Sequence, residues 1–593
     1  MISLVQSMPE VCSNDLGFLK IKCLFDCYKD DKSVLFWRQD KGVYLSFSGG
    51  DMTVSEGGIN AEEMREFISV IAPKSIFCPR KTADLLQIEP KETVNVMFRK
   101  ADITGSAECD SLDSRELYDI LNIEEFTLPP YPDFAVDYCR RLNMGQADYY
   151  GIKDKCAAVS LSSGGYALIT GIVSRQKGLG SKALDTTVLK ECSEVFSGID
   201  NITEYNQLKV LNAYIKNGVS ESYMSGSTGY GYDDRGREIL ENVMACVMGA
   251  EDALMRHNFT CGTHTLAVAL FGILRPGDKM LCLTGRPYDT ITGVIGIDSK
   301  NDGSLADMGV EYRQVELKED SSPDIDGIKA ALKADRYKMA YIQRSRGYST
   351  RKSLTIDVIE KLCKAVKEVS PETVIMVDNC YGEFTETKEP CEVGADIIAG
   401  SLIKNPGGGI APTGGYIAGK HELVEKCAAR LTCPGVGREV GATLGHSREL
   451  YMGLFSAPHV VGEALKTAVY ASRLFEKLGY SVTPKYDEKR GDIIECITLG
   501  SREGLIAFCK GIQSGAPVDA FVVPEPCPMP GYDDEVIMAA GAFTLGASIE
   551  FSADGPLREP YAAWMQGGLN FHSAHAGVLL GAQKMLDDGT LKL

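Results

Sequence analysis

The sequence lacks any run of apolar residues long enough to span a membrane. A transmembrane helix needs roughly 18 or more such residues, whereas the longest candidates, such as residues 265–274, have the length of a core helix. The first residues also lack the basic stretch and the apolar stretch of a secretory signal. We therefore expect a cytoplasmic protein that has no membrane partner.

Positive charge is scarce relative to negative charge. The chain carries 62 Lys and Arg residues against 81 Asp and Glu residues, which gives a formal net charge of −19. Nucleic acids and anionic membranes bind clustered cations. We therefore expect neither of them as a partner.

Metal-binding patterns are also missing. The 19 cysteines form no CxxC pair, and the closest two are Cys23 and Cys27. The seven histidines include no HxH or HExxH pattern, and His572 with His575 is an isolated HxxH. No metal site is predicted, and the cysteines are expected to be free thiols in a reducing compartment.

The chain divides into two regions that differ in their patterns. The first region, residues 1–198, contains strand-like runs at 18–27, 33–37 and 43–47, a helical pattern at 61–71, a hairpin at 157–161 and 166–173, and a helix at about 180–196. A Ser-Gly-Ile-Asp-Asn stretch at 197–201 is predicted to separate it from the second region.

The second region alternates short apolar runs with helical patterns, which is typical of an α/β fold with a mostly parallel sheet. Predicted strands lie at 279–283, 339–343, 374–377 and 397–399, and a long helix is predicted at 460–478. We expect a large domain at 203–435 and a smaller C-terminal α/β subdomain at 436–593.

Four segments of the large domain carry chemistry. A small-residue turn at Gly262 and Thr263 opens an apolar helix, and such a helix start can bind phosphate. Tyr288 follows a strand, and Asp378 ends an apolar strand, where ligands bind in α/β sheets. Lys404 follows another strand and precedes three glycines. A lysine in such apolar surroundings is expected to have a lowered pKa and to do covalent work.

Together these residues match the needs of pyridoxal phosphate. The turn would bind the phosphate, the tyrosine ring would stack on the pyridine, the aspartate would keep the ring nitrogen protonated, and the lysine would form the Schiff base. The separations from Gly262 to Tyr288 and from Asp378 to Lys404 are both 26 residues, which suits one strand–helix–strand step each. Separately, each segment also fits an ordinary turn, a helix-capping acid or a surface lysine.

Residues from about 206 to the C-terminus resemble the aluminium-resistance family, a methionine gamma-lyase-like branch of the fold-type-I pyridoxal phosphate enzymes. The matching segments are GSTGYGYDDRGR at 226–237, RPYDT at 286–290, IQRSRGY at 342–348, VDNCYGEF at 377–384, GSLIKNPGGG at 400–409 and SADGP at 552–556. One departure is Cys261, where the family has serine.

The resemblance implies a role for individual residues. Lys404 would be the Schiff-base lysine, Asp378 would contact the ring nitrogen, and Tyr288 would stack on the ring. The phosphate would be bound by Gly262, Thr263 and Ser401, with Cys261 a weaker contact, and from a neighbouring subunit by Tyr230, Tyr232 and Arg235. The substrate carboxylate is assigned to Arg346 or Arg558, although either could be an ordinary ion pair.

A segment of the first region resembles the coenzyme A loop of GNAT acetyltransferases. Arg175, Gly178 and Gly180 follow a predicted strand and open a predicted helix, as a pyrophosphate-binding turn does. The resemblance implies a GNAT-like α/β domain that could bind acetyl-CoA. A GNAT fold normally continues for another strand, helix and strand after this helix, so the domain could be incomplete or inactive.

The sequence thus predicts an N-terminal GNAT-like domain fused to a carbon–sulfur lyase that eliminates sulfur from an amino-acid substrate, working as a homodimer or homotetramer. A pyridoxal phosphate enzyme of another type, such as an aminotransferase or a decarboxylase, is the alternative. A regulator that binds pyridoxal phosphate or acyl-CoA without catalysis is a third.

Overall fold

The computed structural model describes residues 181–298, 302–529 and 534–591, together with the backbone of eight strands between Val34 and Thr170. The chain divides into two compact units, residues 1–187 and residues 188–592.

The described strands of the first unit form two four-stranded sheets, in the orders β1-β2-β3-β4 and β6-β5-β7-β8. Strands β3 and β4 are parallel and the other pairs are antiparallel. The predicted hairpin is confirmed, since β7 and β8 pair with Ala157 opposite Ile169. The strand bounds are Val34–Arg38, Tyr44–Ser48, Asp51–Val54, Ser75–Phe77, Val94–Lys100, Ile103–Glu108, Cys156–Leu161 and Tyr166–Thr170.

The loop that resembles a coenzyme A site, with Arg175, Gly178 and Gly180, lies outside the described residues. The same holds for the strand expected at 18–27 and the helix expected at 61–71. Coenzyme A binding by the first region therefore stays a prediction.

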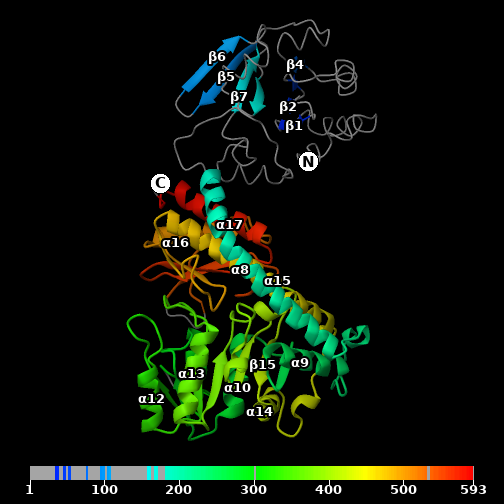
Figure 1. The fold of residues 1–593 in the computed structure, drawn as a ribbon, viewed down its shortest axis with the longest axis vertical. Coiled ribbons are helices and arrows are strands. Elements are labelled where there is room, and N and C mark those ends of the chain that lie inside the picture. The colour runs from blue at the N-terminus through cyan, green and yellow to red at the C-terminus, as the bar shows by residue number, and fades with distance from the viewer. Residues whose placement is uncertain are drawn as a thin grey trace. The chain divides into compact units, whose positions relative to one another are not determined.

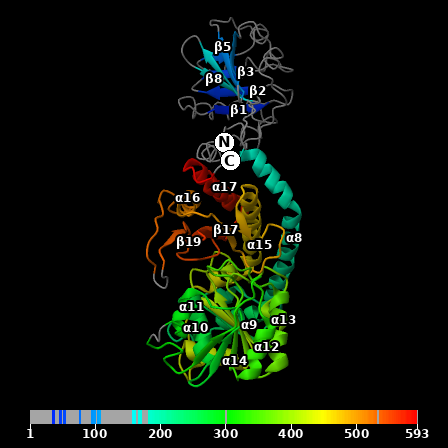
Figure 2. The same ribbon diagram turned by 90° about the vertical axis from the view of Figure 1, so that its left-hand side faces the viewer.

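Helix α8 (Ser181–Lys216) is longer than predicted. The helix begins where predicted but continues 20 residues beyond Phe196, so the stretch expected to separate the domains lies inside it. Gly198 weakens a helix by only about 1 kcal/mol, and contacts with helix α15 (Ser447–Lys477) outweigh that cost. Glu191 pairs with Arg473 at 2.6 Å, and the Tyr214 hydroxyl donates to the Tyr451 carbonyl at 2.6 Å. The two helices lie side by side and antiparallel (Figures 1 and 2).

A seven-stranded, mostly parallel sheet forms the centre of the second unit. Its order is β11-β10-β12-β13-β14-β15-β9, and only β15 runs against its neighbours. The four predicted strands are confirmed to within two residues. The bounds are Asp252–Arg256 for β9, Lys279–Cys282 for β10, Glu311–Gln314 for β11, Met339–Gln343 for β12, Val374–Asp378 for β13, Ile397–Ser401 for β14 and Gly415–Gly419 for β15.

Helices cover this sheet, as Figure 2 shows. Met376 and Ile397 point to the face that carries α10 (Gly262–Ile273), α11 (Asp289–Ile295) and α14 (His421–Leu431), where they share one apolar core. Side chains alternate along a strand, so Asp378 and Ser401, each an even number of residues further on, point to the same face. The remaining helices of the large domain are α9 (Arg235–Met248), α12 (Ile325–Ala334) and α13 (Ile356–Val369).

A smaller sheet follows, with the antiparallel order β16-β17-β20-β19-β18. Helices α16 (Arg502–Ser514) and α17 (Phe571–Asp587) pack together beside it, in the orange and red part of Figure 1. Helix α15 begins 13 residues before the predicted helix and continues through Pro458. The strands are Ser481–Thr483, Glu495–Thr498, Val536–Ala539, Ser552–Pro556 and Ala562–Gln566 for β16 to β20.

Short 3-10 turns complete the second unit, at Glu221–Met224, Pro390–Val393, Asn405–Gly407 and Gly437–Glu439. Among the helices of the described residues, none combines the length and the apolar character that crossing a membrane requires.

Candidate active site

A cavity lies at the carboxyl edge of the large sheet, where β10, β12, β13 and β14 end, and the small sheet closes its other side. Five of the predicted residues line it: Gly262, Thr263, Tyr288, Asp378 and Lys404. The other lining residues that are described below are Gln343, Gly347, Tyr348, Cys380, Tyr381 and Asp554.

Asp378 ends β13 with its carboxyl group buried. One oxygen accepts from the Cys380 backbone N–H at 3.1 Å, and the other accepts from the Tyr341 hydroxyl at 3.3 Å. Burial raises the pKa of Asp378, while Lys404 and the hydrogen bonds oppose that rise. The strand thus supplies a fixed carboxyl group that faces a cation in the same cavity.

Lys404 follows β14 and holds its ammonium 3.9 Å above the centre of the Tyr381 ring. The expectation of a lowered pKa was wrong for the protein without a ligand. Burial opposes the charged lysine, but the acidic groups around it, Asp378 among them, raise the pKa of Lys404 above its ordinary value. Burial also raises the pKa of the Cys380 thiol and that of the Tyr381 phenol.

The loop after Lys404 is held rigidly. The Asn405 side chain donates to the Glu383 carbonyl at 2.9 Å, and the Glu383 carboxyl accepts from the Tyr416 hydroxyl at 2.8 Å. Helix α15 approaches the loop so closely that a Cβ on Gly408 would lie 2.5 Å from the Gly453 carbonyl oxygen, and a Cβ on Gly453 would lie even closer to the Gly407 carbonyl oxygen. The glycines after the lysine therefore serve a close backbone approach.

Helix α10 begins at the cavity wall. Cys261 caps it, because its sulfur accepts from the His264 backbone N–H at 3.3 Å. Ser401 faces this helix start, since a Cβ on Gly262 would lie 3.2 Å from the Ser401 Cβ. The Ser401 side chain is 1% exposed, and its hydroxyl has no hydrogen-bond partner among the described residues.

This corner fits a phosphate group. A buried hydroxyl without a partner is costly, and a phosphate at the N-terminus of α10 would accept its hydrogen bond together with those of the free backbone N–H groups. Thr263 adds a hydroxyl, which lies 2.8 Å from the Thr290 hydroxyl. The Cys261 sulfur already accepts the hydrogen bond that caps the helix, so we assign Cys261 no role in phosphate binding.

Tyr288 lies on the wall between β10 and β12. Its backbone N–H donates to the Gln343 side chain at 2.6 Å, and its ring centre lies 6.1 Å from that of Tyr348. Gly347 has φ of +58°, and a Cβ there would lie 2.7 Å from the Tyr288 ring. Only glycine allows this close packing of backbone on the ring.

Asp554 is a cavity residue that the sequence analysis did not single out. It lies on β19 of the small sheet, 6% exposed, and the Tyr348 hydroxyl donates to it. Burial raises the pKa of Asp554 to about 7, although Tyr348 and Lys404 oppose the rise. Its place within the SADGP motif was visible, but no spacing tied it to Lys404.

The remaining predicted residues do not line this cavity. Tyr230 and Tyr232 are 72% and 61% exposed and stack on each other with ring centres 5.4 Å apart, and Arg235 is also exposed. Arg346 and Arg558 line a second, adjoining cavity. Arg558 is half exposed and forms an ion pair with Asp534 at 2.9 Å. This contact fits the alternative that Arg558 belongs to an ordinary ion pair.

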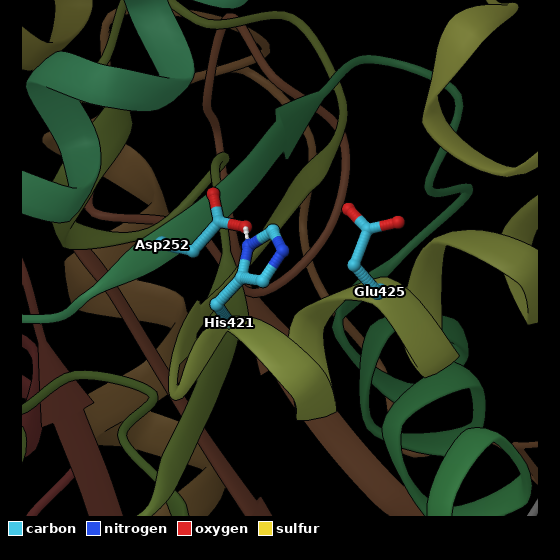
Figure 3. A group of neighbouring side chains, drawn as sticks. All are labelled: Asp252, His421 and Glu425. Carbon is cyan, nitrogen blue, oxygen red and sulfur yellow. Dashed lines mark hydrogen bonds and ion pairs between the residues drawn. The ribbon is translucent and has the colours of Figure 1, made fainter.

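A group of metal-binding residue types lies elsewhere, at Asp252, His421 and Glu425 (Figure 3). His421 contacts Asp252 at 2.7 Å, and the Arg438 guanidinium pairs with Asp252 at 3.0 Å and with Glu425 at 2.9 Å. The arginine already balances the carboxylates, so we assign the group as an ion-pair cluster. The cysteines of the described residues are free thiols, as predicted.

The mostly parallel sheet and the cavity at its carboxyl edge are consistent with a fold-type-I pyridoxal phosphate enzyme. Comparison with known proteins gives the family. Residues 181–586 match the methionine gamma-lyase family, and the chain belongs to that family. Protein YnbB of Bacillus subtilis (strain 168), which is uncharacterised, is 50% identical over 374 residues, which are 63% of this chain and 89% of YnbB.

Solved structures agree with this assignment. A carbon–sulfur lyase involved in aluminium resistance, from Clostridium novyi NT, is 45% identical with a TM-score of 0.68 and covers 77% of this chain and all of its own. A Clostridium acetobutylicum protein, also described as involved in aluminium resistance, is 51% identical with a TM-score of 0.66 and covers 68% of this chain and 95% of its own.

Proposed function

We propose that the chain is a pyridoxal phosphate-dependent carbon–sulfur lyase that eliminates a thiol from a sulfur-containing amino acid. One observation carries the proposal: Lys404 and Asp378 face a single cavity that also contains the start of helix α10, beside the unpartnered Ser401 hydroxyl. The Clostridium novyi relative is described as a carbon–sulfur lyase, which supports the reaction class.

The residues divide the work as follows. Gly262, Thr263 and Ser401 bind the phosphate, and Asp378 holds a proton at the ring nitrogen. When bound, pyridoxal phosphate accepts the electron pair left at the α-carbon. Lys404 anchors the cofactor and then, as a free amine, removes the α-proton. Tyr288 covers the ring.

The departing sulfur needs a proton, and we assign it to Asp554. The carbon–sulfur bond breaks with both electrons on sulfur, and the proton of the Asp554 carboxyl converts the thiolate to a thiol. A carboxyl group with a pKa near the working pH can supply that proton. The overall reaction adds one water to a thioether amino acid and releases a thiol, ammonia and a keto acid.

The pH dependence of turnover should report Asp554. Because its folded pKa lies near 7, above the ordinary value, the protonated fraction falls as pH rises through 7, and kcat should fall with it. Asp554→Asn should lower kcat by about 100-fold and remove this fall. Steady-state assays between pH 5.5 and 9 measure both effects, with absorbance confirming bound cofactor at each pH.

The exposed Asp587→Asn variant on α17 is the matched control and should behave like the wild type. Groups near Asp554 that could contribute are Tyr348, Lys404, Tyr381 and Cys509. If kcat of Asp554→Asn still falls above pH 7, another group donates the proton. Glu383 would be the next candidate, because burial raises its pKa to about 8.

The reaction itself is tested with purified protein loaded with pyridoxal phosphate. Cysteine, methionine and thioether amino acids are supplied one at a time, and thiol and keto acid are measured together. Equal release of both supports the lyase. Keto acid that appears only with an added keto-acid acceptor and without thiol would indicate an aminotransferase, carbon dioxide a decarboxylase, and no product a binding protein.

We also propose a homo-oligomer, at least a dimer. The stacked rings of Tyr230 and Tyr232 are exposed, and Leu444 is 61% exposed. Their two segments are joined by hydrogen bonds from the Gly441 N–H to the Tyr230 carbonyl at 2.9 Å and from the Leu444 N–H to the Ser227 carbonyl at 3.0 Å. A second copy of the chain would bury this apolar surface, and two-fold symmetry is the usual solution.

Light scattering coupled to gel filtration should give at least twice the mass of the chain. Serine at both positions 230 and 232 is expected to shift the protein toward monomer and to lower activity, because the tyrosines would reach the partner's phosphate. A wild-type monomer with full activity would rule this proposal out.

A further inference from the structure

A second cavity, of about 320 Å³, adjoins the cofactor cavity along the same sheet edge. It lies beyond the ends of β11, β10 and β12, whereas Asp378 ends β13 and Lys404 follows β14. The two cavities share Tyr288, Gln343, Gly347 and Tyr348 in their walls. The second cavity therefore adjoins the cofactor cavity across this shared wall.

Arg346 is the unusual residue of the second cavity. Its side chain is 1% exposed, and one nitrogen donates to the Thr483 carbonyl at 2.7 Å. Its other two nitrogens, Nε and Nη2, have no oxygen or nitrogen acceptor in the described part of the chain, and the group that interacts with the guanidinium here is the Cys496 thiol, a weak acceptor. A buried guanidinium with two unused donors is costly unless a ligand accepts from them.

The buried charges around Arg346 do not balance. Arg351 and Arg490 are also buried, which gives three guanidinium groups, and the buried acids in this cluster are Asp492 and Glu495. Glu495 pairs with Arg490 at 2.7 Å, so its carboxylate serves that arginine, and burial raises its pKa to about 7. Burial and the neighbouring Arg346 lower the pKa of Arg351 to about 10, as a surplus of positive charge would.

The other charged residues of the wall are nearer to solvent. Arg286 and Arg558 are half exposed and pair with Asp298 and Asp534. Glu316 is exposed and accepts from Gln314, and Asp289 is half-buried in the first turn of α11. The inner end of the cavity is therefore cationic, and the acids lie in its more solvent-exposed part.

We propose that this second cavity binds a carboxylate at the far end of the substrate, with Arg346 as its main ligand. The inference rests on the proposed function, and it names the substrate class: thioether amino acids whose sulfur carries a chain that ends in an acid. Arg346 follows β12, which lies two strands from β14, and adjacent strands lie about 4.8 Å apart, so the two strand ends are about 10 Å apart along the edge. Because the wall of Tyr288, Gln343, Gly347 and Tyr348 lies between this cavity and that of Lys404, we assign the far carboxylate, and not the α-carboxylate, to Arg346.

Two matched compounds test the proposal with the holoenzyme. S-(2-carboxyethyl)-L-cysteine has a distal carboxylate, and S-(2-carbamoylethyl)-L-cysteine has a neutral amide of the same shape. The wild type should prefer the carboxylate by about 10- to 100-fold in kcat/KM and in Kd by calorimetry. Arg346→Gln should bring both ratios close to one, and Arg346→Lys, which keeps the charge without the fork, should give intermediate ratios.

Arg336 is exposed, lies two residues after the end of α12 and lines neither cavity. The Arg336→Gln variant removes the same charge and should keep the wild-type preference in kcat/KM and in Kd. Thermal melting and cofactor absorbance show that each variant is folded and loaded. If Arg346→Gln weakens both compounds equally, the arginine binds the α-carboxylate that they share, and the proposal is wrong. A wild type without preference overturns it as well.

Calorimetry separates this inference from the proposed function. If binding of the carboxylate compound is preferred and depends on Arg346, but no thiol is released, the proposed anion site is supported and the proposed lyase activity is contradicted. Thiol release from both compounds at equal efficiency would keep the lyase and reject the anion site.

Discussion

Replacing Lys404 with alanine is expected to abolish turnover, by about 10⁴-fold or more, and to remove the visible absorbance of the lysine-bound cofactor. The ammonium lies in the cavity with Asp378 and above Tyr381, and the loop that carries it is fixed by Asn405 and by the glycine contact with helix α15. No other lysine lines the cavity as described. Pyridoxal phosphate can still occupy the phosphate corner, so the variant should bind cofactor without a covalent link.

Borohydride reduction followed by peptide mapping measures that link directly. The wild type should carry reduced cofactor on the peptide that contains Lys404, and the variant should release all of its cofactor on denaturation. Lys352→Ala, an exposed lysine that pairs with Glu488 at 2.7 Å, is the control and should resemble the wild type. Covalently retained cofactor in Lys404→Ala would mean that another lysine is the anchor.

The charge state of Lys404 gives this experiment a second readout. Without a ligand, the pKa of Lys404 lies above its ordinary value because its acidic neighbours outweigh burial. The covalent link forms through the neutral amine, so cofactor attachment should be faster at higher pH, which stopped-flow absorbance can follow.

The sequence predicted the strands of the large sheet and the residues at their ends because buried parallel strands read as short apolar runs. Asp378 and Ser401 could be placed in one site since a strand alternates its faces and its carboxyl end is where ligands bind. The glycine run after Lys404 was likewise visible in the sequence, and the close approach of Gly408 to Gly453 accounts for part of it.

Residues supplied by distant contacts could not be predicted. Asp554 comes from β19, 150 residues after Lys404, and its burial depends on how the small sheet closes the cavity. The cavity of Arg346 depends on the order β11-β10-β12, which does not follow the chain. The length of α8 depends on its contacts with α15. The Ser and Gly residues at 197 and 198 therefore led to a predicted helix end that was too early.

Asp378→Asn is expected to keep the covalent cofactor and its absorbance but to lower kcat by about 100- to 1000-fold with little change in KM. Asparagine fills the same space, its carbonyl oxygen can still accept from the Cys380 backbone N–H, and its amide nitrogen can donate to the Tyr341 hydroxyl, so the end of β13 should hold its shape. It cannot stabilise a proton on the ring nitrogen, and a neutral pyridine is a poor electron sink. Steady-state kinetics on thioether amino acids measures the loss.

Two further variants separate charge from structure. Tyr341→Phe removes only the 3.3 Å hydrogen bond to Asp378 and should cost far less than the loss of the carboxylate. Asp326→Asn, an exposed acid in the first turn of α12, should leave kcat unchanged. If Asp378→Asn is as active as the wild type, the carboxyl group serves only to cap the end of β13 through Cys380. The ring nitrogen would then have no acidic partner from this strand, and an elimination that depends on a protonated ring would have to be abandoned for this chain.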